Sequence, residues 1–376
     1  MPQDAATDLG IQASPLNLAD YEAAAQRVLS PFTWDFFAGG AGEELSVADN
    51  LDAFRRIRLR PRLLQDVAIR NLSTTVLGTD VSLPVLIAPT SVQRLAHPEG
   101  ELATARAAAA VGTVMGCSTY THFRIDEIAA VSSAPLWFQL YPAHSRAVTE
   151  RLVRRAEDAG CRAMVLTADA SYPRRWDIRL RVEQPWPAEC APGNLDRVEW
   201  DIPIPDTWED FAEYPLVWSD LAWLREATSL PFVLKGVLTA EDARLAVEHG
   251  CDGVVVSNHG GRSLDGTLSS IDALPEIVDA AAGQMEIFLD GGIRRGSDAI
   301  KALALGARAV LIGRPFLWGL AVGGEAGVRH VLEILRDEIA GDLAMLGRAD
   351  VRALDRSVVA TGAPLPPSFR PSLPDG

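Results

Sequence analysis

The segment EIFLDGGIRRGSDAIKALALGARAVLIGRP, at residues 286–315, contains the repeat that decides the fold. A hydrophobic run at its start ends in Asp290 and two glycines, and a second run near its end stops at Arg314. Between the two runs, hydrophobic residues recur at the spacing of an amphipathic helix. Strand, helix and strand in this order predict two parallel strands that are joined by a crossover helix.

The same alternation of short hydrophobic runs and helical segments extends back to residue 84. The predicted strands are residues 84–90, 113–119, 136–141, 162–169, 232–236, 253–258, 286–292 and 309–314. Four of the helices are expected to end at a glycine in the left-handed conformation, namely Gly112, Gly160, Gly250 and Gly306. Eight such units predict an α/β fold, a closed (β/α)8 TIM barrel. A doubly wound open sheet is the alternative, but no GxGxxG motif follows the first strand to support it.

The rest of the chain adds an N-terminal helical extension and one long loop to this barrel. Asn17 is a predicted helix cap, and the segments after it predict an aromatic helix, a further helix and short strands. The loop after the fourth strand is rich in proline, tryptophan and acidic residues, and such a long loop is typical of a lid. The predicted organisation is a flexible N-terminus at 1–16, one domain at 17–355 with a lid-like loop at 170–217, and a proline-rich tail at 356–376.

The composition limits the classes of partner. The chain has 376 residues, 48% of them hydrophobic, and a formal net charge of −15. So acidic a chain is not expected to bind nucleic acid or an anionic membrane surface, which select basic proteins. No hydrophobic run reaches the roughly 18 residues of a membrane-spanning helix, and the first residues lack the pattern of a signal peptide. The four cysteines show no metal-binding spacing, so we expect a cytoplasmic enzyme without a metal site.

Polar residues stand at the carboxyl end of every predicted strand. The active sites of such barrels are built at this end, and buried polar groups are costly without partners. A large polar ligand in the barrel mouth would satisfy these side chains together. The residues concerned are Thr90, Ser91, Ser118, Gln139, Tyr141, Thr167, Asp169, Lys235, Ser257, His259, Asp290, Gly313 and Arg314.

Two glycine-rich turns predict where a phosphate binds. The sequences DGGIRRG and IGRP follow the seventh and eighth strands, and barrels often bind phosphate between these two loops. Glycine backbone amides, a helix N-terminus and Arg294 or Arg314 suit a dianion. Lys235, at the end of the fifth strand, is predicted to place a fixed positive charge beside the same ligand.

The sequence SNHGGRSLDG, at residues 257–266, supplies the candidate chemistry. Two glycines let the chain turn sharply and approach a ligand. His259 is then held at the barrel mouth, where an imidazole can accept a proton near neutral pH. Arg262 offers a planar fork to a carboxylate. A base beside an anion clamp predicts proton abstraction from a substrate that carries a carboxylate.

Several long motifs resemble those of the FMN-dependent 2-hydroxy-acid oxidase and dehydrogenase family. They are LPVLIAPTSVQRLAHPEGE, WFQLY, VLKGVLTAEDARLAVEHG, SNHGGRSLDG and FLDGGIRRGSDAIKALALGARAVLIGRP. The family includes glycolate oxidase, lactate oxidase and mandelate dehydrogenase, and the resemblance extends over nearly the whole chain. It implies a barrel that binds FMN and that often assembles as a tetramer.

The resemblance implies which residues hold FMN. Ser118, Gln139 and Thr167 would hydrogen-bond the flavin ring. Lys235 would lie at the N1–C2 edge of the ring, and Ser257 along the ribityl chain. The complete implied set is Pro89, Thr90, Ser91, Ser118, Gln139, Thr167, Lys235, Ser257, Asp290, Gly291, Gly292, Ile293, Arg294, Gly313 and Arg314.

The resemblance also implies the reaction. His259 would be the catalytic base, Asp169 would support its imidazolium form, and Tyr141 would hydrogen-bond the substrate oxygen. A 2-hydroxy acid would lose two electrons to FMN and leave as a 2-oxo acid, and O2 would be reduced to hydrogen peroxide. Hydride transfer and carbanion formation both remain open as the route.

The implied carboxylate site departs from the usual family pattern. Arg262 and Arg175 would bind the substrate carboxylate, and Arg174 is the alternative to Arg175 because the segment ADASYPRRWDI is shorter than usual. A motif that often reads YDYYASG in the family reads WDFFAGG here, so Phe36 takes the place of a tyrosine. This replacement removes one hydrogen bond to the carboxylate and makes the site more apolar.

Further departures concern the substrate side chain and the electron acceptor. Tyr120 stands where several members have tryptophan, and His122 could line the pocket. These features are closest to those of hydroxymandelate oxidases and predict an aryl or bulky (S)-2-hydroxy acid, such as mandelate. Ser91 stands where oxidases often have alanine and several dehydrogenases glycine, so a dehydrogenase with another acceptor is an alternative. Another FMN barrel, such as an isomerase, and a non-catalytic flavin-binding scaffold are the remaining alternatives.

Overall fold

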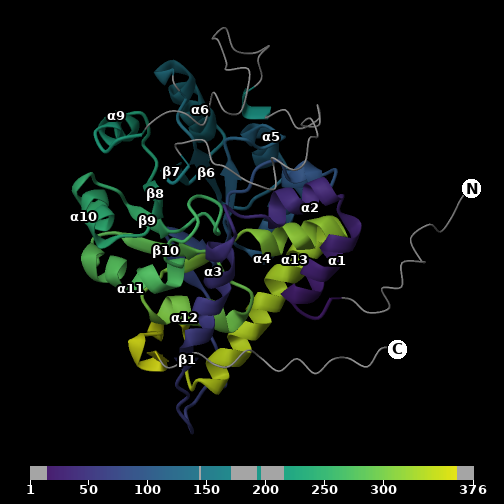
Figure 1. Ribbon diagram of the computed structural model, residues 1–376, viewed down its shortest axis with the longest axis vertical. Coiled ribbons are helices and arrows are strands. Elements are labelled where there is room, and N and C mark those ends of the chain that lie inside the picture. The colour runs from purple at the N-terminus through teal and green to yellow at the C-terminus, as the bar shows by residue number, and fades with distance from the viewer. Residues whose placement is uncertain (1–14, 144, 171–192, 196–215, 362–376) are drawn as a thin grey trace, which may run out of the picture.

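Eight parallel strands close into a barrel in the computed structural model, which describes residues 15–143, 145–170, 193–195 and 216–361 (Figure 1). The strand order around the barrel is β10-β11-β4-β5-β6-β7-β8-β9, so each strand lies beside its neighbours in sequence. The strands are β4 (Val85–Ile87), β5 (Met115–Ser118), β6 (Leu136–Leu140), β7 (Ala163–Thr167), β8 (Phe232–Val237), β9 (Gly253–Val256), β10 (Glu286–Asp290) and β11 (Ala309–Ile312). The predicted (β/α)8 barrel is therefore confirmed.

Side chains that point into the barrel form a core of their own, because successive residues of a strand face opposite sides. Trp137 and Phe288 meet inside the barrel with their ring centroids 5.2 Å apart. The next inward position of each strand, two residues further on, is polar and lies at the barrel mouth. These polar residues are Gln139, Thr167, Lys235, Ser257 and Asp290, which follow Trp137, Val165, Val233, Val255 and Phe288.

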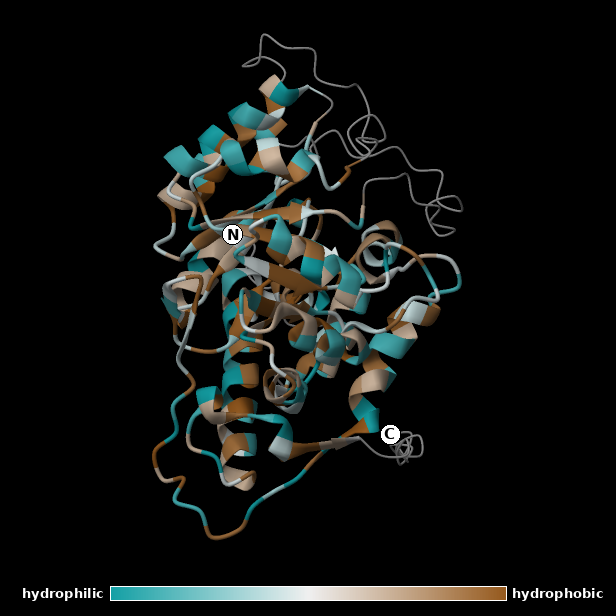
Figure 2. Cartoon of the chain, turned by 90° about the vertical axis from the view of Figure 1, so that its left-hand side faces the viewer, coloured by the Kyte–Doolittle hydropathy of each residue, from teal (hydrophilic) through white to brown (hydrophobic). Residues whose placement is uncertain are grey.

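The second and larger core lies between the strands and the helices that surround them. Figure 2 shows hydrophobic strands in the middle and helices with hydrophilic outer faces. The helices are α4 (Gly100–Val111), α5 (Ile125–Ala130), α6 (Arg146–Asp158), α9 (Asp220–Glu226), α10 (Ala240–Glu248), α11 (Ser270–Ala281), α12 (Gly296–Ala304) and α13 (Arg314–Met345). The predicted glycines at the helix ends, Gly112, Gly160, Gly250 and Gly306, all have positive φ.

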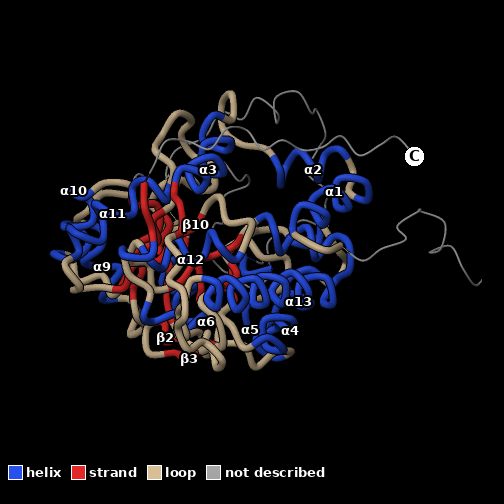
Figure 3. Tube along the Cα trace, turned by 90° about the horizontal axis from the view of Figure 1, so that it is seen from below, coloured by secondary structure: helices blue, strands red, loops and turns tan. Residues whose placement is uncertain are grey.

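Three further helices precede the barrel and reach both its outer wall and its mouth. They are α1 (Leu18–Val28), α2 (Pro31–Ala38) and α3 (Leu45–Arg56). Asn17 caps α1, as predicted, by accepting a hydrogen bond from the backbone N–H of Asp20 at 3.0 Å. The hydroxyl of Tyr21 in α1 lies 2.8 Å from Nδ1 of His330 in α13, which fixes α1 against that helix. In Figure 3, α2 and α3 lie at one end of the barrel strands and β2 and β3 at the other.

Two small antiparallel sheets complete the described chain. In the first, β2 (Thr74–Val76) pairs with β3 (Thr79–Val81), and Val76 and Val81 belong to the core inside the barrel. In the second, β1 (Ile57–Leu59) pairs with β12 (Val359–Thr361), so the folded chain extends beyond residue 355, where the sequence places the start of the tail. The short helices are η1 (Gln93–Leu95), η3 (Gly193–Leu195), η4 (Val351–Ala353) and η5 (Arg356–Val358).

Three predicted features lie largely or wholly outside the described residues. Most of the N-terminus at 1–16, of the lid-like loop at 170–217 and of the tail at 356–376 belongs to these undescribed parts. Within the described chain, no helix combines the length and the apolar character needed to cross a bilayer. Three cysteines, Cys117, Cys161 and Cys251, are buried and form no disulfide.

Candidate active site

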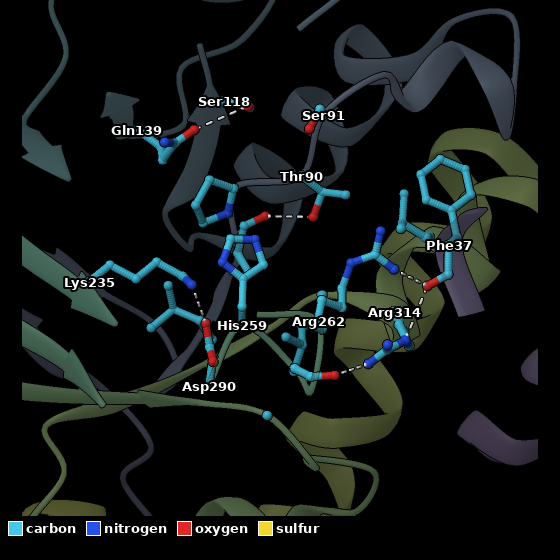
Figure 4. A pocket seen from close by; sticks show the side chains of 18 of the residues that line it. Phe37, Thr90, Ser91, Ser118, Gln139, Lys235, His259, Arg262, Asp290 and Arg314 are labelled. Carbon is cyan, nitrogen blue, oxygen red and sulfur yellow. Dashed lines mark hydrogen bonds and ion pairs between the residues drawn. The ribbon is translucent and has the colours of Figure 1, made fainter. Parts of the chain in front are cut away.

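A pocket opens at the carboxyl ends of the barrel strands, where the sequence places the site (Figure 4). Two predicted site residues, Asp169 and Ser257, lie behind the pocket wall and act on residues that line it. Arg175 and its alternative Arg174 fall outside the described residues. The predicted residues that line the pocket are Phe36, Pro89, Thr90, Ser91, Ser118, Tyr120, Gln139, Tyr141, Thr167, Lys235, His259, Arg262, Asp290, Gly291, Gly292, Ile293, Arg294, Gly313 and Arg314.

Lys235 provides a buried positive charge at the floor of the pocket. Its Nζ lies 3.0 Å from Oγ of Ser257 and 3.3 Å from Oδ2 of Asp290, and Ser257 donates to Oδ1 of Asp290 at 2.6 Å. Burial alone would lower the pKa of Lys235, but Asp290, together with Asp169 and Tyr141, outweighs burial and raises it. The surroundings therefore favour the charged form of the lysine, and its side chain reaches toward the same space as the His259 ring (Figure 4).

An irregularity in β8 lets two functional side chains approach each other. The pairing of β8 with β9 shifts between Lys235 and Val237, which marks a bulge at Gly236. Gly236 has a φ of 111°, and a Cβ atom there would lie 2.6 Å from Cβ of Asp169. Only a glycine therefore fits at this position, and its absent side chain is the space into which Asp169 packs. The sequence signal was an isolated glycine within a predicted strand, which sequence reasoning passed over.

His259 is held from two sides in the orientation of a base. Its Nδ1 lies 2.8 Å from Oδ1 of Asp169, and its backbone N–H donates to Oγ of Ser257 at 2.9 Å. A carboxylate beside Nδ1 favours the tautomer with the proton on Nδ1, which leaves the lone pair on Nε2. The residue has a φ of 59°, a left-handed conformation that is uncommon outside glycine. The pairing of His259 with Asp169 agrees with the roles that the family resemblance implies.

Two arginines place positive charge at the opposite end of the pocket. Burial lowers the pKa of Arg294, and the pKa of Arg314 falls to about 10 through burial and the nearby charge of Arg294. Nε of Arg294 is buried and, among the described residues, has no hydrogen-bond acceptor. Its nearest carboxylate oxygen is that of Glu22, 4.0 Å away. Such a pair of cations favours an anionic ligand, and the N-terminus of α13, which begins at Arg314, faces the same space.

Arg262, in the loop that carries His259, and Arg314, at the start of α13, both bind the end of α2. Nη1 of Arg262 donates to the carbonyl oxygens of Phe37 at 3.2 Å and Gly39 at 2.8 Å. Arg314 donates to the same two oxygens at 3.1 and 3.0 Å, and its third bond, at 2.8 Å, is to the carbonyl of Gly260 (Figure 4). The end of α2 is thereby tied to the loop that carries His259. The sequence gave no signal for these carbonyl partners, because they come from a distant helix end.

Aromatic side chains form one wall of the pocket. The rings of Tyr120 and Tyr141 stack with their centroids 5.4 Å apart, and the Arg262 guanidinium lies 5.5 Å from the centre of the Phe36 ring. The sequence analysis missed further lining residues, which are Phe37, Ala88, Ala170, Gly260, Leu311, Ile312, Pro315 and Leu317. It was wrong about His122, which does not line the pocket and instead accepts a hydrogen bond at Nδ1 from the backbone of Arg94 at 3.2 Å.

The pocket meets the chemical requirements of a flavin nucleotide. Besides Nε of Arg294, buried polar atoms without a partner in the described chain include Nε2 of Gln139 and Oγ1 of Thr167. Both residues line the end of the pocket beside Lys235, whereas the arginines line the other end. A ligand with a polar ring at one end and a phosphate at the other would satisfy all three atoms. Among the described residues, no cluster of His, Cys, Asp and Glu is arranged to hold a metal ion.

Comparisons with known proteins agree with this site. The family model described as FMN-dependent dehydrogenase matches residues 25–361. The chain is 48% identical to an L-lactate oxidase of Nostoc sp. over 92% of this chain and 98% of that protein. It is 44% identical to the glycolate oxidase of Spinacia oleracea over 92% and 95%. A crystal structure of mandelate oxidase matches with a TM-score of 0.86 at 42% identity, covering 93% of this chain and 99% of that one.

The chain belongs to the FMN-dependent dehydrogenase family, and the resemblance inferred from its motifs is confirmed. Its cofactor is FMN. The relatives of 48% and 44% identity are hydroxy-acid oxidases, which favours this class over another FMN barrel such as an isomerase. Bound FMN would account for the positive charge at both ends of the pocket, that of Lys235 at one end and those of Arg294 and Arg314 at the other.

Proposed function

We propose that this protein is an oxidase that uses FMN and O2 to convert an (S)-2-hydroxy acid with an aryl or other bulky side chain into the 2-oxo acid. The observation that carries the proposal is the arrangement of His259, Asp169 and Arg262 around one pocket. It provides a base and an anion-binding group in the same pocket as the buried Lys235. The relatives of high identity are named L-lactate oxidase and glycolate oxidase, which supports both the substrate class and oxygen as acceptor.

FMN fits the pocket in one direction. The polar ring would lie against Gln139, Thr167 and Lys235, and the phosphate against Arg294 and Arg314 together with Gly313. Bound FMN would supply the two-electron acceptor that no protein side chain provides. Lys235 would stabilise negative charge that develops at the ring, because its own positive charge is fixed by Asp290.

The protein side chains would bind the substrate and move its proton. Arg262 would hold the substrate carboxylate by a charge-assisted hydrogen bond, since the planar fork of a guanidinium matches the two oxygens of a carboxylate. Nε2 of His259 would accept the proton, and Asp169 would stabilise the resulting imidazolium through Nδ1. Tyr141 would hydrogen-bond the substrate oxygen. Arg175, outside the described residues, remains a proposed second carboxylate ligand, with Arg174 as its alternative.

The preference for a bulky substrate rests on the aromatic wall. Phe36 offers no hydroxyl to a carboxylate, and its ring together with Tyr120 makes the wall apolar. A small hydroxy acid would leave this surface in contact with water, whereas an aromatic ring would bury it. Crystal structures of mandelate oxidase with benzoylformic acid, and of a variant with (S)-mandelic acid, match this chain at 42% and 41% identity. They support both the aryl side chain and the (S) configuration.

We also propose that the enzyme is a cytoplasmic homotetramer. The family resemblance supports the tetramer. The three buried, unpaired cysteines of the described chain support a reducing compartment. The acidic composition supports the prediction that neither nucleic acid nor an anionic membrane is a partner.

The test is an anaerobic titration of the purified, FMN-loaded protein with both enantiomers of mandelate, lactate and glycolate. We expect (S)-mandelate to bleach the visible absorbance of oxidised FMN faster than lactate or glycolate does. Air admitted afterwards should restore the absorbance and produce hydrogen peroxide. Restoration only by an added dye would identify a dehydrogenase instead. Bleaching by none of the acids would contradict the proposed reaction and favour the non-catalytic scaffold.

The variant Phe36→Tyr adds a sharper test of the substrate class. It restores the hydroxyl that many family members have at this position and leaves the ring in place. One hydrogen bond is worth roughly 1 kcal/mol, so the new bond to the carboxylate should raise kcat/KM for lactate by about 3- to 10-fold. Mandelate carries the same carboxylate, but its aromatic ring would lie against a wall that the hydroxyl makes more polar, so its gain should be smaller and the ratio of lactate to mandelate should rise. An unchanged ratio would show that Phe36 does not set the preference.

A further inference from the structure

Helix α3 lies outside the barrel, yet one of its side chains contacts the loop that carries the catalytic base. This loop, residues 257–266, is called the His259 loop below. Asn50 is buried at 2% exposure, and its Nδ2 donates to Oδ1 of Asn258 at 2.8 Å. In return, Nδ2 of Asn258 donates to Oδ1 of Asn50 at 2.9 Å. The two amides thus form a closed, reciprocal pair between segments that are 208 residues apart.

Asn258 passes this contact on to the backbone around His259. Its Oδ1 also accepts the N–H of Gly261 at 3.0 Å, and its Nδ2 also donates to the carbonyl of Leu268 at 3.2 Å. The side chain therefore spans the turn in which His259 adopts its left-handed conformation. Such a conformation is strained in a residue other than glycine and persists only when the surroundings over-determine it. The pair of amides from Asn50 and Asn258 is part of the surroundings that hold His259 in this conformation.

Asn50 also supports the loop after β10. A Cβ atom on Gly292 would clash with the carbonyl oxygen of Asn50, so the loop passes directly over α3 at this residue. A Cβ atom on Gly291 would lie 3.4 Å from Nδ2 of Asn50. Asn50 therefore contacts two neighbouring loops, after β9 and β10, that both line the pocket, although it does not line the pocket itself.

The far end of the His259 loop is fixed to the same helix. Glu44, at the start of α3, makes no side-chain capping bond. Instead, Oδ1 of Asp265 accepts the N–H of Ser46 at 2.8 Å, and its Oδ2 accepts the N–H of Glu43 at 2.9 Å. These bonds from the backbone lower the pKa of Asp265. Helix α3 thus holds the His259 loop at both ends, and a shift of the helix would shift the loop.

We propose that Asn50 is a positioning residue of the oxidation, which acts through Asn258 on the backbone that orients His259. The inference rests on the proposed function, because it concerns the rate at which this base takes a proton. Asn50 does not touch the substrate or FMN in this arrangement. Its loss leaves the amide of Asn258 without two of its hydrogen bonds and the left-handed turn less constrained.

The experiment measures single-turnover bleaching of FMN by saturating (S)-mandelate, without oxygen, in a double-mutant cycle of Asn50→Ala and Asn258→Ala. We expect Asn50→Ala to slow bleaching about 10-fold or more, because small displacements of a catalytic group are costly. The ratio of FMN to protein and the substrate concentration for half-saturation should stay near those of the wild type. In the Asn258→Ala background, Asn50→Ala should add little, because the pathway to His259 is already broken.

The matched control is Asn17→Ala, which removes an amide side chain that caps the first turn of α1 through the backbone N–H of Asp20. It should lower thermal stability and leave the bleaching rate at the wild-type value. A wild-type rate in Asn50→Ala would overturn the proposal, and so would equal slowing by Asn50→Ala in both backgrounds. If Asn50→Ala fails to fold, Asn258→Ala decides alone, and an unchanged rate in that variant overturns the proposal. A wild-type protein that no hydroxy acid bleaches would instead refute the proposed function, so the two failures are distinguishable.

Discussion

His259 and Asp169, which are 90 residues apart in the chain, meet with Nδ1 of the imidazole 2.8 Å from Oδ1 of the carboxylate. His259 follows β9 and Asp169 follows β7, and β8 lies between these two strands in the barrel. The contact crosses β8 at its bulge, where Gly236 leaves room for Asp169. The proposed base is therefore oriented by a residue whose place depends on the strand between them.

Replacement of Asp169 by asparagine tests the role of this contact. Asp169→Asn keeps the size of the side chain but removes the charge that stabilises an imidazolium. We expect kcat to fall on the order of 100-fold, within the usual range for general base catalysis, and KM to change little. Steady-state kinetics with mandelate provide the measurement. A rise of KM on the order of 100-fold with an unchanged kcat would instead assign Asp169 to substrate binding.

Gly236→Ala tests the geometry rather than the charge. The added methyl group would lie 2.6 Å from Cβ of Asp169 and push the carboxylate away from His259. Gly250→Ala is the matched control, because Gly250 also has a positive φ, of 71°, but no neighbouring atom within 4 Å of the added methyl group. Gly250→Ala should lose about 1 kcal/mol of stability through backbone strain, and Gly236→Ala should lose more because its methyl group also clashes with Asp169. Only Gly236→Ala should also lower kcat, by about 10-fold or more, and equal kcat values would contradict the assigned role of the bulge.

The fold and much of the pocket could be predicted because they follow from local pattern. The ends of the predicted strands placed Gln139, Lys235 and Asp290 at the barrel mouth, and the structure has them in the pocket there. The repeat of eight units then predicted that the carboxyl ends of the strands meet at one mouth of the barrel. The prediction for Phe36 did not come from local pattern, because only comparison with a family motif shows that a tyrosine is replaced.

The unpredicted features depend on contacts between distant segments. Nothing near Arg314 in sequence indicates that it binds carbonyl groups at the end of α2. Asp265 likewise belongs to the SNHGGRSLDG motif but binds the start of α3, more than 200 residues earlier in the chain. The prediction for His122 failed for a related reason, since spacing from Tyr120 does not reveal that the chain turns the ring inward. Such contacts are fixed by packing, and a single sequence does not show them.

Lys235→Met tests whether the lysine and Asp290 act as a buried ion pair. Removal of the cation would leave the carboxylate of Asp290, which is 6% exposed, with Ser257 as its neighbour but without a counter-charge. Loss of one partner of a buried pair typically costs about 3–5 kcal/mol. We expect a loss of this size in the free energy of unfolding, measured by urea denaturation of the FMN-free protein. Asp290→Asn added to Lys235→Met should recover most of it, and failure to recover would show that the two residues are not energetically coupled.

Glu101→Gln tests a buried carboxyl group that joins two loops beside the pocket. Oε1 of Glu101, in α4, accepts the backbone N–H groups of Gln93 at 3.1 Å and His122 at 3.2 Å. Burial raises the pKa of Glu101 to about 7, although these hydrogen bonds and Arg94 oppose the shift. A carboxyl group whose pKa is higher in the folded than in the unfolded protein favours folding at low pH. That contribution is complete below about pH 4.5 and is lost as the pH rises through about 7.

The variant should therefore gain stability relative to the wild type as the pH rises. Glutamine keeps the accepting oxygen and carries no charge, so it avoids the cost of a buried carboxylate above pH 7. The difference in unfolding free energy should be small near pH 5 and reach on the order of 3 kcal/mol in favour of the variant near pH 8. Thr104→Val is the control, because it removes a neutral hydrogen bond to Gln93 in the same cluster and should cost the same at every pH. A constant difference between Glu101→Gln and the wild type from pH 5 to pH 8 would mean that Glu101 does not titrate in this range.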